Sequence, residues 1–169
     1  MPPLRYEVAE TGRGRFRFGS EAGGALVSLD LPGRWRPRGD ETPARPAWAR
    51  WLRSYLAGGS PSFPGRWRLP GDSGFFRRVY RCVAAVPGGR TLSYAGVARR
   101  CGSPGAARAV GNAMARNPLP LIVPCHRVVA ESGLGGYGGG LDFKRALLAA
   151  EKAHAYARSP AKRPAVKSK

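Results

Sequence analysis

The sequence is short of acidic residues and of long apolar runs. It holds 10 Asp and Glu residues against 29 Lys and Arg residues, a formal net charge of +19 at pH 7 over 169 residues. No stretch approaches the roughly 20 consecutive apolar residues that span a bilayer. The N-terminus, MPPLRYEVAE, lacks the apolar core of a signal peptide. We therefore expect a cytoplasmic protein (nuclear in a eukaryotic cell) with no membrane partner.

Cysteine and histidine are also scarce. The three cysteines, Cys82, Cys101 and Cys125, form no CxxC pair, and only His126 and His154 could join them as ligands. An odd number of cysteines at these spacings argues against a disulfide framework and against a structural zinc site. We expect no metal and no cofactor.

The excess of positive charge favours nucleic acid as the partner, because basic side chains displace the counterions condensed on the phosphates. The alternative is a solvated basic surface with no partner. Part of the excess lies in residues 157–169, which contain Lys, Arg and Pro but no acid. We expect this segment to be a disordered basic tail.

The first 70 residues have the pattern of strands. RFRF alternates charged and aromatic residues, and ALVSLDL alternates well enough for a half-buried strand, with Gly and Pro at the turns. The composition changes at RLPGDSG, residues 68–74, beyond which the pattern is helical. We expect an α+β protein with a β-rich domain over 1–70 and a mainly helical domain over 71–156.

Helical patterns follow one another after this break. FFRRVYRCVAAV places its apolar residues on one face, and Asp72 or Ser73 can cap it. A second helix is expected from about Ser93, and a third over 105–116, closed by Asn117 and a proline. Two short helices around a tight glycine turn indicate a helix-turn-helix or a plain helical hairpin, which look alike in sequence.

The helix over 105–116 is unusually rich in small residues. Arg108 is the main long polar side chain in its first turns, and the small residues are Ala106, Ala107, Ala109, Gly111 and Ala113. A helix that reads base edges in the major groove normally projects several long polar side chains. This helix instead allows close approach of its backbone, either to a ligand or to another helix.

The segment PLPLIV, residues 118–123, carries prolines that exclude a regular helix, so we expect it to be extended and buried and to deliver Cys125 at its end. A glycine-rich loop spans 133–140. The last helix, LDFKRALLAAEKAHAYA, is expected to be capped by Asp142, with Glu151 one turn beyond the inward-facing Leu147.

The motif PCHRVV contains a candidate nucleophile. A free thiol with a pKa of about 8.5 is only a few per cent ionised at pH 7, so a reactive cysteine needs a base or a positive field beside it. His126 adjoins Cys125, but neighbours on a strand point to opposite faces, so the pair works together only if the backbone turns or a water bridges them. The alternative is a buried cysteine beside a hydrogen-bonded histidine.

The block RAVGNAMARNPLPLIVPCHRVV, with SYAGVA before it and GGLDFKRALLAAE after it, closely resembles the O6-alkylguanine-DNA alkyltransferases, also called methylated-DNA–protein-cysteine methyltransferases. The resemblance runs from about Phe75 to Glu151. It implies an N-terminal domain that resembles ribonuclease H, followed by a helix-turn-helix domain. The first 70 residues match the family only in kind.

The resemblance implies a single-turnover DNA repair enzyme that transfers an alkyl group from O6 of guanine irreversibly to Cys125. It implies a Glu–His–water–Cys relay in which Glu151 orients His126 and His126 activates the thiol. It also implies that Tyr94 protonates or hydrogen-bonds the leaving guanine. The implied partner is double-stranded DNA that contains O6-alkylguanine, and we expect a monomer.

The resemblance further implies contacts to DNA and to the base. Arg108 would fill the gap left by a flipped nucleotide, since O6 is otherwise stacked and paired. Asn117 would tie the recognition helix to the active-site segment. The small residues that would let the helix enter the minor groove are Ala106, Ala107 and Gly111. The groups that would form the base pocket are Pro120, Tyr137 and the backbone carbonyls of Cys125 and Val128.

This chain departs from the family pattern at two places. Some members carry a serine after the loop tyrosine, where this chain has Gly138, which puts one contact to O6 in doubt and predicts a roomier pocket. Some members bind zinc in the N-terminal domain, but no Cys or His precedes Cys82 here. Three alternatives stay open: a noncatalytic alkylguanine-binding relative, which Cys125 argues against, a basic helix-turn-helix protein with an incidental thiol, and a cysteine hydrolase.

Overall fold

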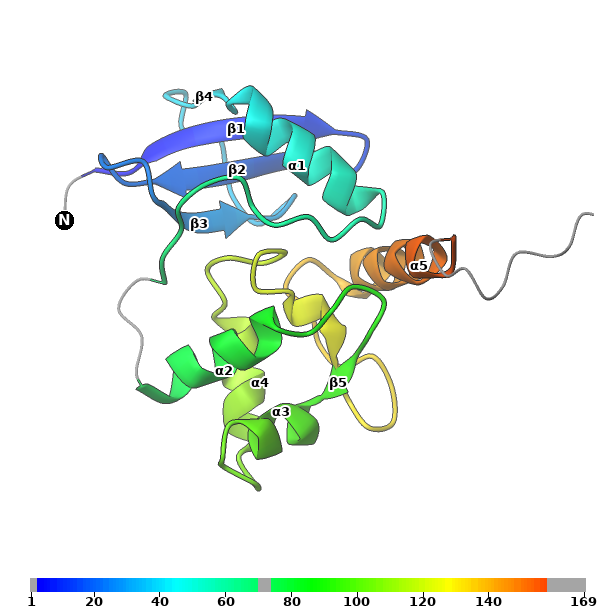
Figure 1. Cartoon of the computed structure of the whole chain (residues 1–169). Coiled ribbons are helices and arrows are strands. Elements are labelled where there is room, and N and C mark those ends of the chain that lie inside the picture. The colour runs from blue at the N-terminus through cyan, green and yellow to red at the C-terminus, as the bar shows by residue number, and fades with distance from the viewer. Residues whose placement is uncertain (1–2, 70–73, 158–169) are drawn as a thin grey trace, which may run out of the picture.

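The structure, a computed structural model, describes residues 3–69 and 74–157, which form a mixed α+β fold (Figure 1). The N-terminal region holds a four-stranded sheet of order β3-β2-β1-β4, in which β1, β2 and β3 pair antiparallel and β4 runs parallel to β1. The strands of this sheet are β1 (Arg5–Thr11), β2 (Gly14–Ser20), β3 (Leu26–Asp30) and β4 (Thr42–Pro43). The two strands predicted from RFRF and ALVSLDL are therefore confirmed.

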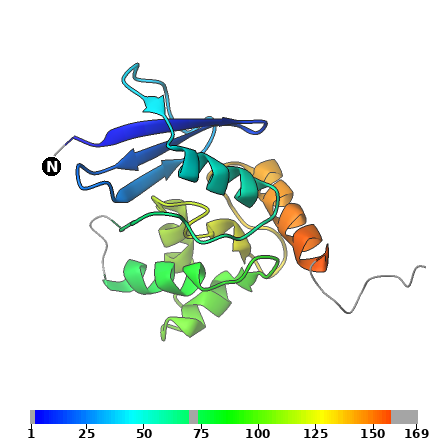
Figure 2. The ribbon, with the colours of Figure 1, turned by 45° about the horizontal axis from the view of Figure 1, so that its top comes forward.

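Helix α1 (Pro46–Leu56) lies within the region predicted to be β-rich and was not predicted from the sequence. Proline at its first position is compatible with a helix start, since that N–H has no intrahelical partner. Its buried side chains recur at helical spacing and are Trp48, Trp51, Leu52 and Tyr55. Trp48 packs on Phe18 of the sheet, with the ring centroids 5.3 Å apart. The helix covers the buried face of the sheet (Figure 2).

The predicted helices after residue 74 are confirmed within one or two residues. The elements are α2 (Gly74–Ala84), α3 (Tyr94–Arg100) and α4 (Ala107–Ala115). Ser93 caps α3 by accepting a hydrogen bond from the Gly96 N–H at 3.0 Å. The caps predicted for α2, Asp72 and Ser73, lie outside the described residues, as does the predicted domain boundary at residue 70.

The segment 118–124 is buried as predicted, but the prediction that it is extended is wrong. The Val123 N–H donates to the Leu119 carbonyl at 2.8 Å, and Leu121 has a left-handed φ of 74°, so the chain forms a tight turn here. Asn117 holds this turn by donating from its side chain to the Val123 carbonyl at 2.8 Å and accepting from the Leu119 N–H at 3.0 Å. The tie predicted for Asn117 is thus present, and the turn precedes a 3₁₀ helix, η1 (Cys125–Arg127).

The last helix, α5 (Leu141–Ala157), packs beside η1. Two short strands, β5 (Leu92–Ser93) and β6 (Val128–Val129), form a parallel pair. Asp142 is its second residue rather than its cap, and its carboxylate accepts from Arg145 at 2.7 Å instead. Of the predicted tail only Ala157 is described, and it ends α5. Within the described residues, no helix combines the length and apolar character needed to cross a membrane.

Candidate active site

The reactive-cysteine motif lies on a backbone turn. Pro124 leads into η1, and the Arg127 N–H donates to the Pro124 carbonyl at 2.9 Å. A 3₁₀ helix rotates about 120° per residue, so Cys125 and His126 are not held on opposite faces as they would be on a strand. Cys125 is 7% exposed and His126 is fully buried. The backbone turn that cooperation between the two side chains requires is therefore present.

Glu151 from α5 contacts His126, as predicted. Its Oε1 lies 2.8 Å from His126 Nε2, and both side chains are buried. Burial alone would raise the Glu151 pKa, but hydrogen bonds from His126 and Arg127 lower it to about 2. The carboxylate is therefore ionised at neutral pH and can only accept, which assigns the proton to Nε2 and leaves the lone pair on Nδ1.

His126 is a neutral base in this environment. Burial lowers its pKa below the ordinary value, and the bond to Glu151 only partly opposes this effect. Its Nδ1 is buried and makes no hydrogen bond to any described residue. A neutral imidazole with an unengaged lone pair, whose other nitrogen is held by a carboxylate, has the properties of a general base.

Burial raises the pKa of the Cys125 thiol, so it is protonated at rest. Four groups oppose this effect: the Asn117 side chain, the Lys144 ammonium, and the N–H groups of Cys125 and His126. These groups favour the thiolate once its proton leaves, because each of them donates toward or attracts a negative sulfur. The site therefore contains a protonated thiol, a neutral base, and groups that stabilise the thiolate when it forms.

Lys144 is a site residue that was not predicted from the sequence. It is completely buried in α5, and its Nζ donates to the carbonyls of Val128 at 2.7 Å, Leu134 at 2.6 Å and Gly136 at 3.2 Å. The ammonium thereby fastens the glycine-rich loop to β6 and places a positive charge near Cys125. Its spacing from Leu147 and Glu151 on one helix face was the signal that could have revealed it.

Arg127 adjoins the Cys125–His126 pair in sequence, but its contact with Glu151 was not predicted, and it holds Glu151 from the other side. Its Nη2 lies 2.8 Å from Glu151 Oε1, and its Nε is 3.1 Å from both carboxylate oxygens. The N-terminal region anchors this guanidinium, since Nη2 also donates to the Tyr55 hydroxyl and to Ser60 Oγ, each at 2.9 Å. The Tyr55 ring stands edge-on to His126, with the centroids 6.1 Å apart. The carboxylate of the relay is therefore fixed by both halves of the chain.

Cys125 opens onto two adjoining cavities of about 280 and 170 Å³. The predicted residues Tyr94, Gly111 and Tyr137 line the first with it, and Asn117 and Pro120 line the second. Burial raises the Tyr94 pKa, and a negative charge on Cys125 would raise it further, so the phenol stays a donor at neutral pH. The relay residues Glu151 and His126, the donor Tyr94 and most of the residues predicted for the base pocket therefore lie around the Cys125 thiol.

Other predicted residues lie away from these cavities. Ala106, Ala107 and Arg108 lie at the start of α4 and line neither cavity, with Arg108 exposed. Val128 is buried, and its carbonyl already accepts from Lys144, so the contact predicted from this carbonyl to the base has to coexist with that bond. The contacts expected of these four residues stay predictions.

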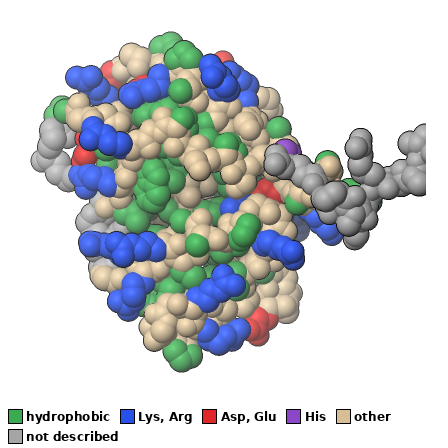
Figure 3. Space-filling model, viewed as in Figure 1, with side chains coloured by type: hydrophobic (Ala, Val, Ile, Leu, Met, Phe, Trp, Pro, Cys, Tyr) green, Lys and Arg blue, Asp and Glu red, His purple; other side chains and the backbone are tan. Residues whose placement is uncertain are grey.

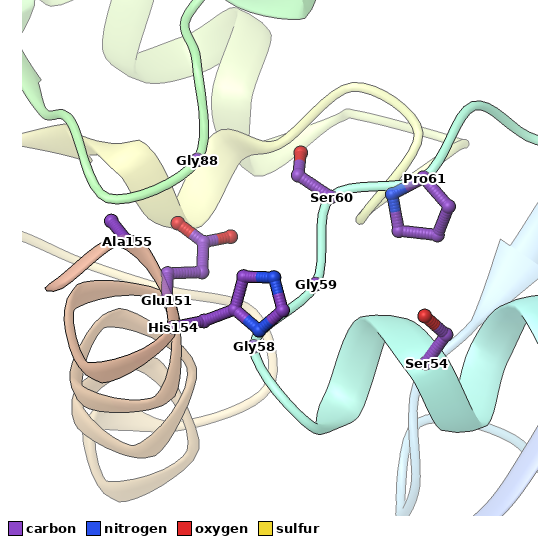
Figure 4. Close-up of a pocket in the computed structure, with 9 residues that line it drawn as sticks. All are labelled: Ser54, Gly58, Gly59, Ser60, Pro61, Gly88, Glu151, His154 and Ala155. Carbon is purple, nitrogen blue, oxygen red and sulfur yellow. The ribbon is translucent and has the colours of Figure 1, made fainter. Parts of the chain in front are cut away.

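A larger cavity of about 510 Å³ lies behind the relay and does not reach Cys125. Figure 4 shows Glu151 projecting between the loop at Gly88 and the segment around Ser60, with His154 beside Gly58. Glu151 also accepts from the Gly89 N–H at 3.1 Å. We place the candidate chemistry in the cavities at Cys125, because neither Cys125 nor His126 is among the residues that line the cavity behind Glu151.

The fold and the site define an α+β protein in which a buried cysteine is paired with a histidine–glutamate couple and opens onto a small cavity. The family described as "6-O-methylguanine DNA methyltransferase, DNA binding domain" matches residues 74–153. The crystal structure of Mycobacterium tuberculosis OGT in complex with DNA is similar to this chain with a TM-score of 0.76 and 37% identity, over 88% of this chain and 93% of that one. This chain belongs to the 6-O-methylguanine DNA methyltransferase family.

Two further relatives support this assignment. A methylated-DNA–protein-cysteine methyltransferase of Mycolicibacterium paratuberculosis is 50% identical over 104 residues, which cover 61% of this chain and 62% of that protein. The crystal structure of the O6-methylguanine-DNA methyltransferase from Pyrococcus kodakaraensis is similar with a TM-score of 0.67 and 27% identity, over 88% of this chain and 98% of that one. The sequence match spans just under two thirds of the Mycolicibacterium protein.

Proposed function

We propose that this protein repairs DNA by transferring an alkyl group from O6 of guanine to Cys125 in a single turnover. The observation that carries the proposal is the buried chain of contacts from Arg127 through Glu151 to His126, which sits next to a cysteine that opens onto a cavity. The names of the curated relatives support the same activity. Cys125 also argues against a noncatalytic relative.

The proposed reaction balances on the residues of the site. His126 Nδ1 takes the Cys125 proton through a water, and Glu151 stabilises the imidazolium that results. The thiolate attacks the alkyl carbon and forms a C–S bond, while the C–O6 bond breaks and its electron pair stays on the guanine. Tyr94 donates a proton or a hydrogen bond to the leaving base. The thioether cannot be reversed by these groups, so each protein molecule reacts once.

We further propose that the base reaches Cys125 by leaving the duplex, since O6 is otherwise stacked and paired. In this proposal α3 and α4 act as a helix-turn-helix, the small residues of α4 approach the minor groove, and Arg108 fills the space left by the base. Gly111 supports this arrangement, because a Cβ added there would meet nothing within 4 Å in the described structure. Basic side chains outnumber acidic ones on the face seen in Figure 3, which suits a DNA partner.

The layout predicted for the chain also remains a proposal: a ribonuclease H-like region over 1–70, a DNA-binding region over 71–156, and action as a monomer. The sheet with α1 packed on it is compatible with the first part of this layout.

Intact mass spectrometry after mixing with duplex DNA that contains O6-methylguanine tests the proposed function. We expect the protein to gain the mass of one methyl group, with no further gain when the DNA is in excess. A DNA-binding protein with an incidental thiol would keep its mass. A cysteine hydrolase would return to its original mass and turn over repeatedly.

A further inference from the structure

Arg34 belongs to the N-terminal region, yet it lines both cavities that contain Cys125. It follows β3, and its side chain is exposed, whereas Cys125 is buried. Arg34 therefore reaches from the surface to the cavity that holds the nucleophile. Among the sequence-predicted site residues, none comes from this part of the chain.

The loop that carries Arg34 is held in place. Gly33 adopts a left-handed φ of 73°, and the Arg34 N–H closes a turn onto the Leu31 carbonyl at 3.1 Å. The next residue, Trp35, lies against two guanidinium groups, those of Arg15 and Arg17, which stand 5.6 and 4.8 Å from its ring centroid. These cation–π contacts restrict the position of the Trp35 ring, which would otherwise be free to move on an exposed loop. The backbone of Arg34 thus has a defined position at the cavity entrance.

The charge of Arg34 is not neutralised within the described structure. Asp30 also lines one of the two cavities, but its carboxylate accepts from Arg17 at 2.8 Å. No ion pair joins Arg34 to an acid within residues 3–69 and 74–157. Gly138, which presents no side chain, also lines both cavities. An unpaired guanidinium at the opening of the cavity is suited to bind an anionic group of the substrate.

We infer that Arg34 binds a phosphate of the alkylated nucleotide and thereby positions that nucleotide in the cavity. The inference rests on the proposed function. If O6 is to face Cys125 on the buried floor, the sugar and its phosphates have to lie at the entrance, where Arg34 is exposed. A guanidinium matches two oxygens of a phosphate with two parallel N–H donors. The assignment makes Arg34 a substrate-binding residue supplied by the N-terminal region.

The test compares wild type with Arg34→Ala and with a matched control, Arg36→Ala, which removes the same charge from an exposed residue of the same loop that lines neither cavity. Rates of alkyl transfer are measured on duplex DNA with O6-methylguanine and on an O6-alkylguanine free base, which has no phosphate. We expect Arg34→Ala to slow transfer from duplex about two- to fivefold, as for a solvent-exposed ion pair, and to leave the free-base rate unchanged. Arg36→Ala should leave both rates close to wild type.

A second arm identifies the phosphate directly. Duplexes are made with an uncharged methylphosphonate on either side of the alkylated nucleotide, and the effects of this change and of Arg34→Ala are combined in a double-mutant cycle. At the contacted position the two losses should not add. The negative slope of the logarithm of the rate against the logarithm of the salt concentration should be shallower by about 0.9 in Arg34→Ala, as expected for one lost phosphate contact.

The outcomes separate failure of the inference from failure of the proposed function. A wild-type protein that gains no methyl group refutes the function itself. A wild type that reacts, with Arg34→Ala equal to Arg36→Ala on duplex, overturns the role of Arg34. Equal losses on duplex and free base would also overturn it, because Arg34 would then act on the base and not on a phosphate.

Discussion

Replacing Glu151 by Gln is the most direct test of the relay. The change keeps the shape of the side chain but removes the negative charge that accepts from His126 at 2.8 Å and from Arg127. The bond from Glu151 raises the pKa of His126 against the effect of burial. Without the charge, the imidazole becomes a weaker base and its proton acceptor is no longer an anion. Transfer at pH 7 should therefore slow.

The size of the effect follows from the geometry. A buried hydrogen bond to a charged group contributes about 1.5–3 kcal/mol, which corresponds to a loss of roughly 10- to 100-fold in rate if the whole bond serves the imidazolium. Stability should fall as well. The Glu151 pKa is lowered from 4.5 to about 2, which is worth about 3 kcal/mol at neutral pH. Because this pKa is depressed, that stability is present above pH 4.5 and is lost as the pH falls toward 2.

The assay is a pH–rate profile of Cys125 alkylation for wild type, Glu151→Gln and the control Glu131→Gln, which removes an exposed carboxylate. Folding is followed in parallel by denaturant unfolding, so that rates are compared only where each protein is folded. We expect the rate of Glu151→Gln to approach that of wild type as the pH rises toward the raised pKa of the thiol, because hydroxide then removes the proton directly. Superimposable profiles for the three proteins would refute the role of Glu151 in making the nucleophile.

Three further predictions follow from the same geometry. Peptide mapping after reaction should find the alkyl group on Cys125 alone, since Cys82 and Cys101 line neither of the two cavities at Cys125. The variant Cys125→Ala should bind DNA without accepting an alkyl group. Label on Cys82 or Cys101 would contradict the assignment of Cys125. Arg108→Ala should slow transfer from duplex DNA at least several-fold more than transfer from the free base, and equal losses would exclude the role of filling the vacated space. Tyr55→Phe keeps the ring beside the imidazole but removes the hydroxyl that accepts from Arg127, so it should cost about 1 kcal/mol of stability. It should also displace the pH–rate profile, because the Arg127 charge affects the pKa of His126. A loss of stability with an unmoved profile would show that Tyr55 is purely structural.

The sequence predicted the parts of the site that lie on strongly patterned segments. The helix expected from about Ser93 and the helix expected over 105–116 follow from local rules of helix start and spacing, which act over a few residues. Glu151 was placed by its distance from Leu147 along one helix, and the resemblance paired it with His126. These relations survive in the structure because each depends on one element with a regular period.

The parts that were missed depend on contacts between distant segments. Lys144 looks like a surface lysine until the three carbonyls that surround it are brought together by the loop 133–140. The turn over 118–124 was predicted to be extended because prolines exclude a helix, yet the left-handed Leu121 and the bonds to Asn117 are set by tertiary packing. Local pattern cannot specify either feature, since burial and partner choice decide them.

The buried charged groups of the site depend on one another. Glu151 stays ionised because His126 and Arg127 donate to it. Arg127 is tolerated in the interior because the carboxylate, Tyr55, Ser60 and the Val86 carbonyl accept from it. A buried ion that loses one partner costs far more than the intact network contributes. The N-terminal region therefore affects the chemistry even though the cysteine, the base and the carboxylate all lie after residue 74. Substitutions in that region are therefore expected to disturb the relay wherever they remove a contact to Arg127, as at Tyr55 and Ser60.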